Sequence, residues 1–266
     1  MAQVARLDWL AKLGFLARAV VYTLLGTIAL NTRAKADKGQ YAVFESLRDM
    51  PGGALMLTLT AVGLLAYGVF RLIGALIDID AEGGGAKGWF KRAGQLVSGI
   101  AHTVLAYTAW QYVSNVEQAK GGGQGGQKAA RTVLDLPLGE LLLGVVGIYF
   151  FVVAASQAMK AWNASFMRQI DRSAPSYTRP LGRAGHAARA VVFAVIGWSL
   201  VRAAWFDSVG EAKALGGALA SLRDNEVLYP LVAVGLITFG LFSLILARYR
   251  IVPQVDAVQA ARAKLR

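Results

Sequence analysis

Three arginines are the residues of this sequence best placed to do chemistry, because each adjoins a long apolar stretch. Arg18 and Arg189 precede the apolar runs 19–32 and 190–201, and Arg71 directly follows the run 50–70. Charged residues within a membrane tend to face cavities and pathways rather than lipid. If all three point inward, they form a cationic cluster that can contact an anionic solute or a lipid headgroup.

Two other interpretations of these arginines stay open at the level of the sequence. Their apolar stems can let the guanidinium groups reach the lipid phosphates, as arginines near helix ends commonly do. Alternatively, the guanidinium groups can donate hydrogen bonds to free carbonyls of neighbouring helices. Ser98 and His102, which fall inside the apolar run 93–116, are further candidates for polar groups within the membrane.

Other kinds of reactive site find little support in the residue types. The chain has no cysteine, which excludes disulfides, thiolate metal sites and a cysteine nucleophile. The apolar runs contain neither a His-Glu-x-x-His zinc motif nor a Ser, His and Asp set suited to hydrolysis. No Asp or Glu lies in the middle of a run, which argues against a proton-coupled pump. We therefore expect a protein that is not an enzyme and has no cofactor.

The elements that must position these residues are long apolar helices. The sequence is 56% hydrophobic and 17% charged, and about 20 apolar helical residues cross a bilayer. Four uncharged runs, at 50–70, 93–116, 141–159 and 227–247, are long enough alone. The shorter runs 19–32 and 190–201 reach this length if each helix extends past Arg18 or Arg189. The sequence therefore predicts an all-α integral membrane protein with six transmembrane helices.

An internal repeat organises these helices into pairs. The segment 10–26 matches 181–197 at constant spacing, and 90–102 is a more divergent copy in which Ser98 and His102 replace the arginine and the aromatic residue. We expect three parallel two-helix units at 9–80, 89–168 and 180–250 within a single membrane domain, arranged with pseudo-threefold symmetry. Short amphipathic helices are expected at the interface before Asp49, Asp135 and Asp224. The register of the second helix of the middle unit, around Gly147, stays open.

The histidines do not suggest a haem site. His102 follows its repeat glycine, Gly94, by eight residues, whereas His186 follows the equivalent Gly185 by one. The difference corresponds to about 10 Å along a helix. Two histidines at such different depths are poorly placed to ligate one iron.

Charge indicates how the protein sits in the membrane. Most of the 28 Lys and Arg residues fall in the N-terminal segment, the second and fourth loops and the basic tail 251–266, and such loops are typically cytoplasmic. We therefore expect both termini in the cytoplasm and attraction to a bilayer with anionic headgroups. That attraction accounts for the net charge of +12 without a nucleic-acid partner.

The repeated pattern resembles a known family. A Gly-x-x-x-Arg-x-x-Val-Tyr/Phe-x-x-x-Gly helix is paired with a Gly-Leu-x-x-Tyr/Phe-Gly helix, and this combination is similar to a bacterial membrane family catalogued as domain of unknown function 1206. The residues that carry the first pattern are Gly14, Arg18, Tyr22, Gly26, Gly185, Arg189, Phe193 and Gly197. The resemblance implies three two-helix units in a bacterial inner membrane, and it implies no activity.

Two functional hypotheses follow from these observations. The first is a non-enzymatic inner-membrane protein that serves as an accessory, scaffold or assembly subunit with a membrane-protein partner. The second is a passive channel or carrier for small anions that uses the inward-facing arginines Arg18, Arg71 and Arg189. A solid centre of the bundle would favour the first hypothesis, and a wet basic centre would favour the second.

Overall fold

The structure, a computed structural model, describes residues 2–31, 40–78, 85–114, 125–206, 218–219 and 221–251. Every named element in these residues is a helix, and the one β-bridge joins Ile170 to Arg250. The long helices are α1 (Ala2–Asn31), α3 (Gly53–Ile77), α4 (Ala86–Ser114), α7 (Gly139–Asn163), α8 (Thr178–Trp205) and α10 (Leu228–Tyr249). The short ones are α2 (Gln40–Arg48), α6 (Gly125–Leu134) and the 3-10 helix η3 (Ser165–Gln169). The all-α prediction is confirmed, and the predicted tail beyond Ile251 lies outside the described residues.

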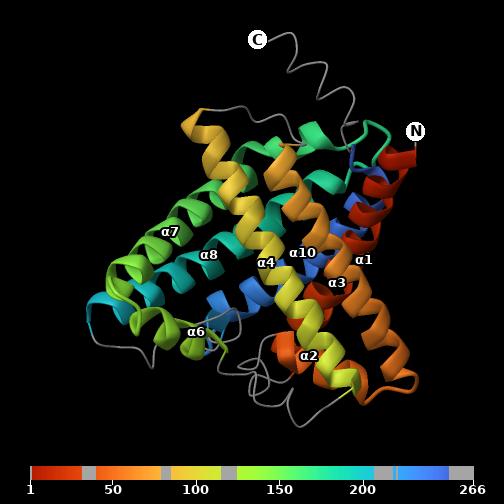
Figure 1. The fold of residues 1–266 in the computed structure, drawn as a ribbon. Helices are drawn as coiled ribbons and strands as arrows, with labels where there is room; N and C mark the ends of the chain where they lie inside the picture. The colour runs from red at the N-terminus through yellow and green to blue at the C-terminus, as the bar shows by residue number, and fades with distance from the viewer. Residues whose placement is uncertain are drawn as a thin grey trace.

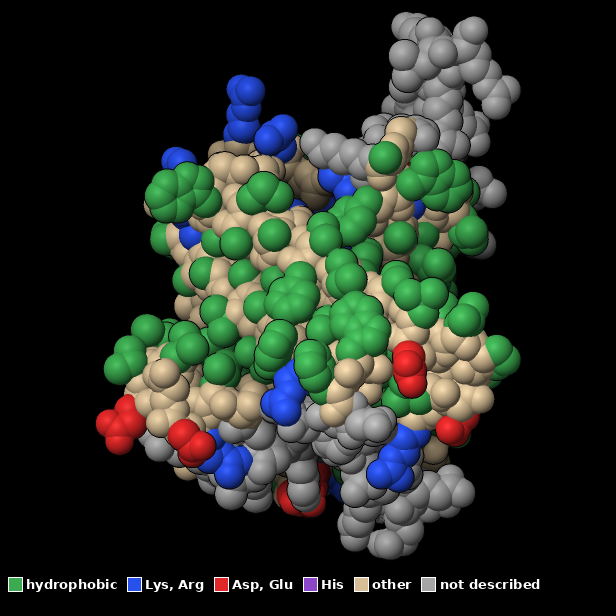
Figure 2. All heavy atoms as spheres, turned by 90° about the vertical axis from the view of Figure 1, so that its left-hand side faces the viewer, with side chains coloured by type: hydrophobic (Ala, Val, Ile, Leu, Met, Phe, Trp, Pro, Cys, Tyr) green, Lys and Arg blue, Asp and Glu red, His purple; other side chains and the backbone are tan. Residues whose placement is uncertain are grey.

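Five of the long helices, α1, α3, α7, α8 and α10, are long and apolar enough to cross a membrane. Helix α4 has sufficient length, but polar residues such as Gln95, Ser98 and His102 make it less apolar. The protein is therefore a multi-pass membrane protein, and the predicted sixth crossing stays a prediction. Figure 2 shows the broad apolar surface that these helices present between the two ends of the bundle.

The two ends of this bundle differ in their acidic side chains. Helices α1, α4 and α8 begin at the upper end in Figure 1, where α3 and α7 end. The main-chain amide of Asp171 in the α7–α8 connection donates to the carbonyl of Tyr249, which places the end of α10 there too. In Figure 2 Lys and Arg side chains lie at both ends, whereas the visible Asp and Glu side chains lie only toward the other end. We call the upper end in Figure 1 the basic end and the opposite end the far end.

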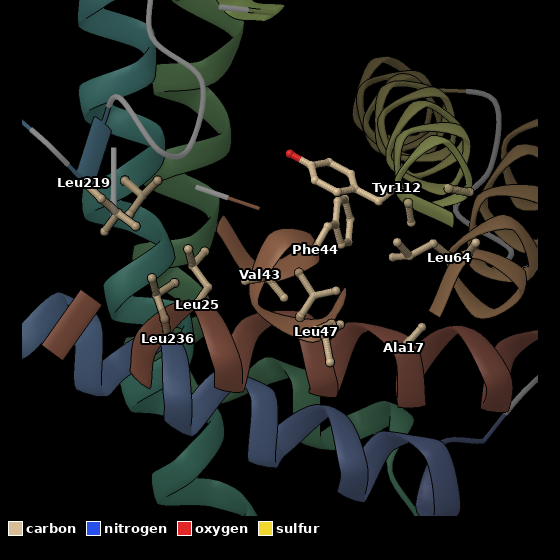
Figure 3. Packing of buried hydrophobic residues seen from close by; sticks show 14 of the residues in the cluster. Ala17, Leu25, Val43, Phe44, Leu47, Leu64, Tyr112, Leu219 and Leu236 are labelled. Atoms are coloured by element: carbon tan, nitrogen blue, oxygen red, sulfur yellow. The ribbon is translucent and has the colours of Figure 1, made fainter. Parts of the chain in front are cut away.

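Short segments fill the far end of the bundle. The predicted helices before Asp49 and Asp135 are present as α2 and α6, whereas the segment before Asp224 has only Ala218 and Leu219 described as helical. Helix α2 enters the core, because Val43 and Phe44 are fully buried there together with Leu219. Figure 3 shows these side chains directed toward residues of the long helices. The far end is therefore closed by apolar packing.

The same connection recurs between successive units. The Arg92 guanidinium at the start of α4 donates to the last carbonyls of α3, at 2.7 Å from Ala75 and 3.1 Å from Leu76. Arg183 near the start of α8 donates in the same way to α7, at 2.7 Å from Ala161 and 3.0 Å from Trp162. Cations at helix C-termini satisfy carbonyls that have no partner within the helix.

Helices α3 and α7 can now be aligned without ambiguity. Each has 25 residues and ends at a residue in the left-handed conformation, Asp78 with φ 50° or Ala164 with φ 51°. Counted from the first residue of each helix, Tyr149 stands where α3 has Gly63. This alignment resolves the register that the sequence left open for the middle unit.

This exchange of glycine for tyrosine separates the middle unit from the other two. Helix α1 packs extensively on α3, and α8 on α10, whereas no comparable packing joins the described parts of α4 and α7. At Gly63 the helices are so close that a Cβ would lie 2.6 Å from the Cβ of Ala17. Tyr149 cannot permit that approach. Its ring instead reaches across to α4, with its centroid 5.3 Å from that of Phe90. We call this line the α4–α7 seam.

Candidate functional site: an arginine layer near the basic end

Arg18 connects three helices inside the bundle. Its side chain is only 7% exposed. The Nε–H donates to the hydroxyl of Ser243 on α10 at 3.0 Å, and an Nη–H donates to the hydroxyl of Tyr67 on α3 at 2.8 Å. The guanidinium of Arg18 therefore faces the interior, and the interpretation in which it reaches lipid phosphates is wrong for this residue.

Aromatic rings bring the three predicted arginines together. The Arg18 guanidinium lies 5.2 Å from the ring centroid of Tyr67 and 4.8 Å from that of Phe239. Arg71 lies 5.6 Å from the Tyr67 centroid, and Arg189 lies 4.5 Å from the Phe239 centroid. Cations are attracted to the faces of such rings, most strongly where water is excluded. Two rings thus organise one arginine layer, which consists of Arg18, Arg71 and Arg189.

The hydrogen-bonding of the layer is incomplete. The Nε atoms of Arg71 and Arg189 are buried and have no hydrogen-bond partner. Among the residues that the structure describes, no Asp or Glu forms an ion pair with any arginine of the layer. Buried polar groups are almost always hydrogen-bonded in native proteins. The layer therefore has donors and positive charge in excess.

Two residues that the sequence did not single out extend this group toward the α4–α7 seam. Lys160 on α7 interacts electrostatically with Arg189 and Arg71. The hydroxyl of Tyr149 is buried without a hydrogen-bond partner, and it also interacts with Arg71. Lys160 could have been noticed as the first cation after the run 141–159. Tyr149 could not, because its importance depends on the register of α7.

The polar residues of the middle unit are engaged locally. The Nδ1 atom of His102 lies 2.7 Å from the main-chain oxygen of Ser98 in the preceding turn of α4. Its ring meets that of Tyr67 edge to face, with centroids 4.6 Å apart. His102 thus packs beside the arginine layer without joining its hydrogen bonds.

His186 is held on the other side of the layer. It is buried on α8, and its Nδ1 atom lies within hydrogen-bond distance of the Gln157 side-chain oxygen on α7. The described residues contain no group of three His, Cys, Asp or Glu side chains that could hold a metal ion. The unsatisfied donors of Arg71, Arg189 and Tyr149 are the groups of this region that are chemically suited to an anion.

Comparison with known proteins places the chain among relatives without an assigned activity. A family described as Domain of Unknown Function (DUF1206) matches residues 13–78, 93–164 and 184–250, one match within each predicted unit. The chain is 31% identical over 249 residues to "Uncharacterized protein YxxB" of Bacillus subtilis (strain 168). The aligned region covers 90% of this chain and 90% of that protein. No solved structure matches the chain.

Proposed function

The chain belongs to the family Domain of Unknown Function (DUF1206), and from this premise we propose that it is a non-enzymatic membrane protein whose arginine layer binds an anion. One observation carries the proposal. The layer and its neighbours present hydrogen-bond donors from Arg71, Arg189 and Tyr149 that have no described acceptor.

Buried donors without acceptors make the arginine layer unfavourable when no anion is bound. A buried donor without a partner costs roughly 1–3 kcal/mol, and more if it is charged. An anion with several oxygen atoms can accept hydrogen bonds from several donors at once, and it offsets the mutual repulsion of the arginines. Bound anion would therefore satisfy a cluster that the protein alone leaves incomplete.

Conduction across the membrane is less well supported than binding. A continuous apolar cluster fills the middle and far part of the bundle, with contributions from α1, α2, α3, α4, α8 and α10. An anion that passed through this packing would lose its hydration without receiving other partners. We therefore favour an accessory or assembly subunit that holds an anion over a channel or carrier.

The proposed setting is a bacterial inner membrane crossed six times. Helix α4 has 29 residues, which at 1.5 Å per residue give about 43 Å, more than enough to cross the hydrocarbon core. With α4 as the sixth crossing, both termini lie on one side. The distribution of Lys and Arg then supports a cytoplasmic position for the basic end.

The test is thermal unfolding of the purified protein in mild detergent, with phosphate or sulfate added at constant ionic strength. A bound anion should raise the Tm by about 5 °C when its concentration is about 100 times Kd. Arg189→Gln removes one incomplete donor and should abolish most of this rise. Arg168→Gln removes an exposed charge outside the layer and should preserve the rise.

Further outcomes distinguish the hypotheses. Absence of any anion-dependent rise, in the presence of phospholipid as well as of free anions, would refute anion binding. Anion flux into liposomes that depends on Arg18 and Arg189 would instead establish the carrier. Purification in mild detergent should recover a membrane-protein partner, and a clean monomer would argue against the accessory role.

A further inference from the structure

We infer that the anion is the phosphate of an anionic phospholipid, which enters sideways through the α4–α7 seam with its acyl chains against α4 and α7. The inference rests on the proposed anion binding and specifies the ligand of the same site. Three features support it: an entrance, a set of donors and an apolar track.

The entrance follows from the position of Tyr149. In the first and third units the helix pairs are closed at Gly63 and Gly235, where a Cβ would lie 2.6 and 2.4 Å from an alanine Cβ of the partner helix. In the middle unit the Tyr149 ring stands between the two helices, with its centroid 5.3 Å from that of Phe90 and its hydroxyl 2.9 Å from where a Cβ on Gly94 would lie. The seam is thus the side of the bundle left least closed by helix packing.

The donors lie just inside this entrance. Tyr149 and Lys160 are both on α7, and each interacts electrostatically with Arg71. Lys160 also interacts with Lys91 at the start of α4, on the opposite side of the seam. Lys160 lies three residues before the end of α7 at Asn163, which is about 5 Å along the helix. A phosphate at the depth of lipid headgroups can therefore meet Lys160 first and Arg71 next.

Both helices that form the seam carry exposed apolar side chains against which acyl chains can lie. On α4, Ile100 is 53% and Val104 is 55% exposed, and on α7 Val145 is 54% and Val152 is 45% exposed. Figure 2 shows this apolar surface below an end where the surface is hollowed and Lys and Arg side chains lie beside the hollow. A free anion gains nothing from such a surface, whereas a phospholipid matches both parts.

The experiment compares three probes on the full chain in detergent: phosphatidylglycerol, phosphatidylcholine and glycerol phosphate. Native mass spectrometry reports retained lipid, and thermal unfolding reports stabilisation. Phosphatidylglycerol should be retained about tenfold more than phosphatidylcholine, because its headgroup carries net negative charge. Glycerol phosphate, which has an acidic phosphate group but no acyl chains, should stabilise the protein much less at equal concentration.

Variants locate the bound lipid. Lys160→Gln should reduce the preference for phosphatidylglycerol severalfold, and Tyr149→Phe, which removes only the hydroxyl, should reduce it less. Arg168→Gln, at the same end but outside the site, should retain the full preference. The Tm of each variant without lipid checks that the fold persists, and the conservative Tyr149→Phe change keeps the test valid if Lys160→Gln unfolds.

The outcomes separate the two proposals. Equal stabilisation by glycerol phosphate and phosphatidylglycerol would overturn the phospholipid and its entrance but keep anion binding. Retained preference in both Lys160→Gln and Tyr149→Phe would overturn the seam as the location. Failure of all acidic probes to bind would overturn anion binding itself.

Discussion

The first and middle units contain the same two-helix design with opposite outcomes at the contact between their helices. In the first unit Gly63 lets α1 and α3 touch, and Arg18 adds a hydrogen bond to Tyr67 across the same interface. In the middle unit Tyr149 stands in place of Gly63, and Ser98 stands in place of Arg18. With these two exchanges, the close helix packing of the first unit has no counterpart between the described parts of α4 and α7.

Arg18 and Arg189 give a second comparison, because they occupy equivalent positions in different units. Ser243 accepts a hydrogen bond from Arg18. The residue of α7 that aligns with Ser243 is Gln157, which pairs with His186 instead. Arg189 is therefore left with a buried Nε that has no partner. The same residue type thus has hydrogen-bond partners in one unit and an unsatisfied donor in another.

The largest expected effect comes from copying the middle unit into the first with Gly63→Tyr. A phenol ring there must force α1 away from α3, because even a Cβ would lie 2.6 Å from Ala17. We expect a loss of about 3 kcal/mol or failure to fold. Thermal unfolding in detergent measures the loss, with Leu59→Tyr at an exposed position of the same helix as the control. Equal tolerance of both variants would contradict the role assigned to Gly63.

The next largest effect is the difference in stability loss between Arg18→Ser and Arg189→Ser. Arg18→Ser removes two buried hydrogen bonds from a charged donor and should cost about 2–4 kcal/mol. Arg189→Ser removes a donor that is already unsatisfied and should cost under about 1 kcal/mol in the absence of an anion. Denaturation of both variants under the same conditions checks the contrast. Equal losses would show that the two arginines are not distinguished by their partners.

Smaller effects are expected where the units connect in the same way. Arg92→Gln and Arg183→Gln each remove bonds to two carbonyls at a helix end, and each should cost about 1 kcal/mol. The two losses should be similar, because this junction does not differ between the units. A large loss at only one of them would mean that the middle unit diverges at its junctions too.

The smallest effect concerns the connection from the middle unit to the third. The hydroxyl and main-chain amide of Ser173 donate to Asp171 at 2.6 and 2.8 Å, and these bonds lower the pKa of that carboxyl. Because its pKa is lowered on folding, Asp171 stabilises the protein above the ordinary pKa of Asp, about 3.9, and this contribution fades as the pH falls below it. Asp171→Asn should flatten the dependence of the Tm on pH between about 5 and 3. An unchanged dependence would exclude a folded-state role for this carboxylate.

The sequence predicted the helices well because apolar length and repetition are local properties. The runs that became α1, α3, α7, α8 and α10 could be counted directly, and the repeat glycines marked the units. Helix α4 shows that a run without charged residues need not be strongly apolar, since polar uncharged residues also lower hydropathy. That α2 inserts Phe44 into the core could not be predicted, because an apolar face fits an interface and a bundle equally well.

By itself, the sequence determined that the chain is a set of apolar helices in three related units, with basic residues at one end and arginines at recurring positions. Only the tertiary structure decided which arginine is satisfied and which is not, because hydrogen bonds depend on neighbours from other units, such as Ser243 for Arg18. Only the tertiary structure also revealed the α4–α7 seam. Tyr149 keeps α4 and α7 apart, and this depends on which helix faces that residue.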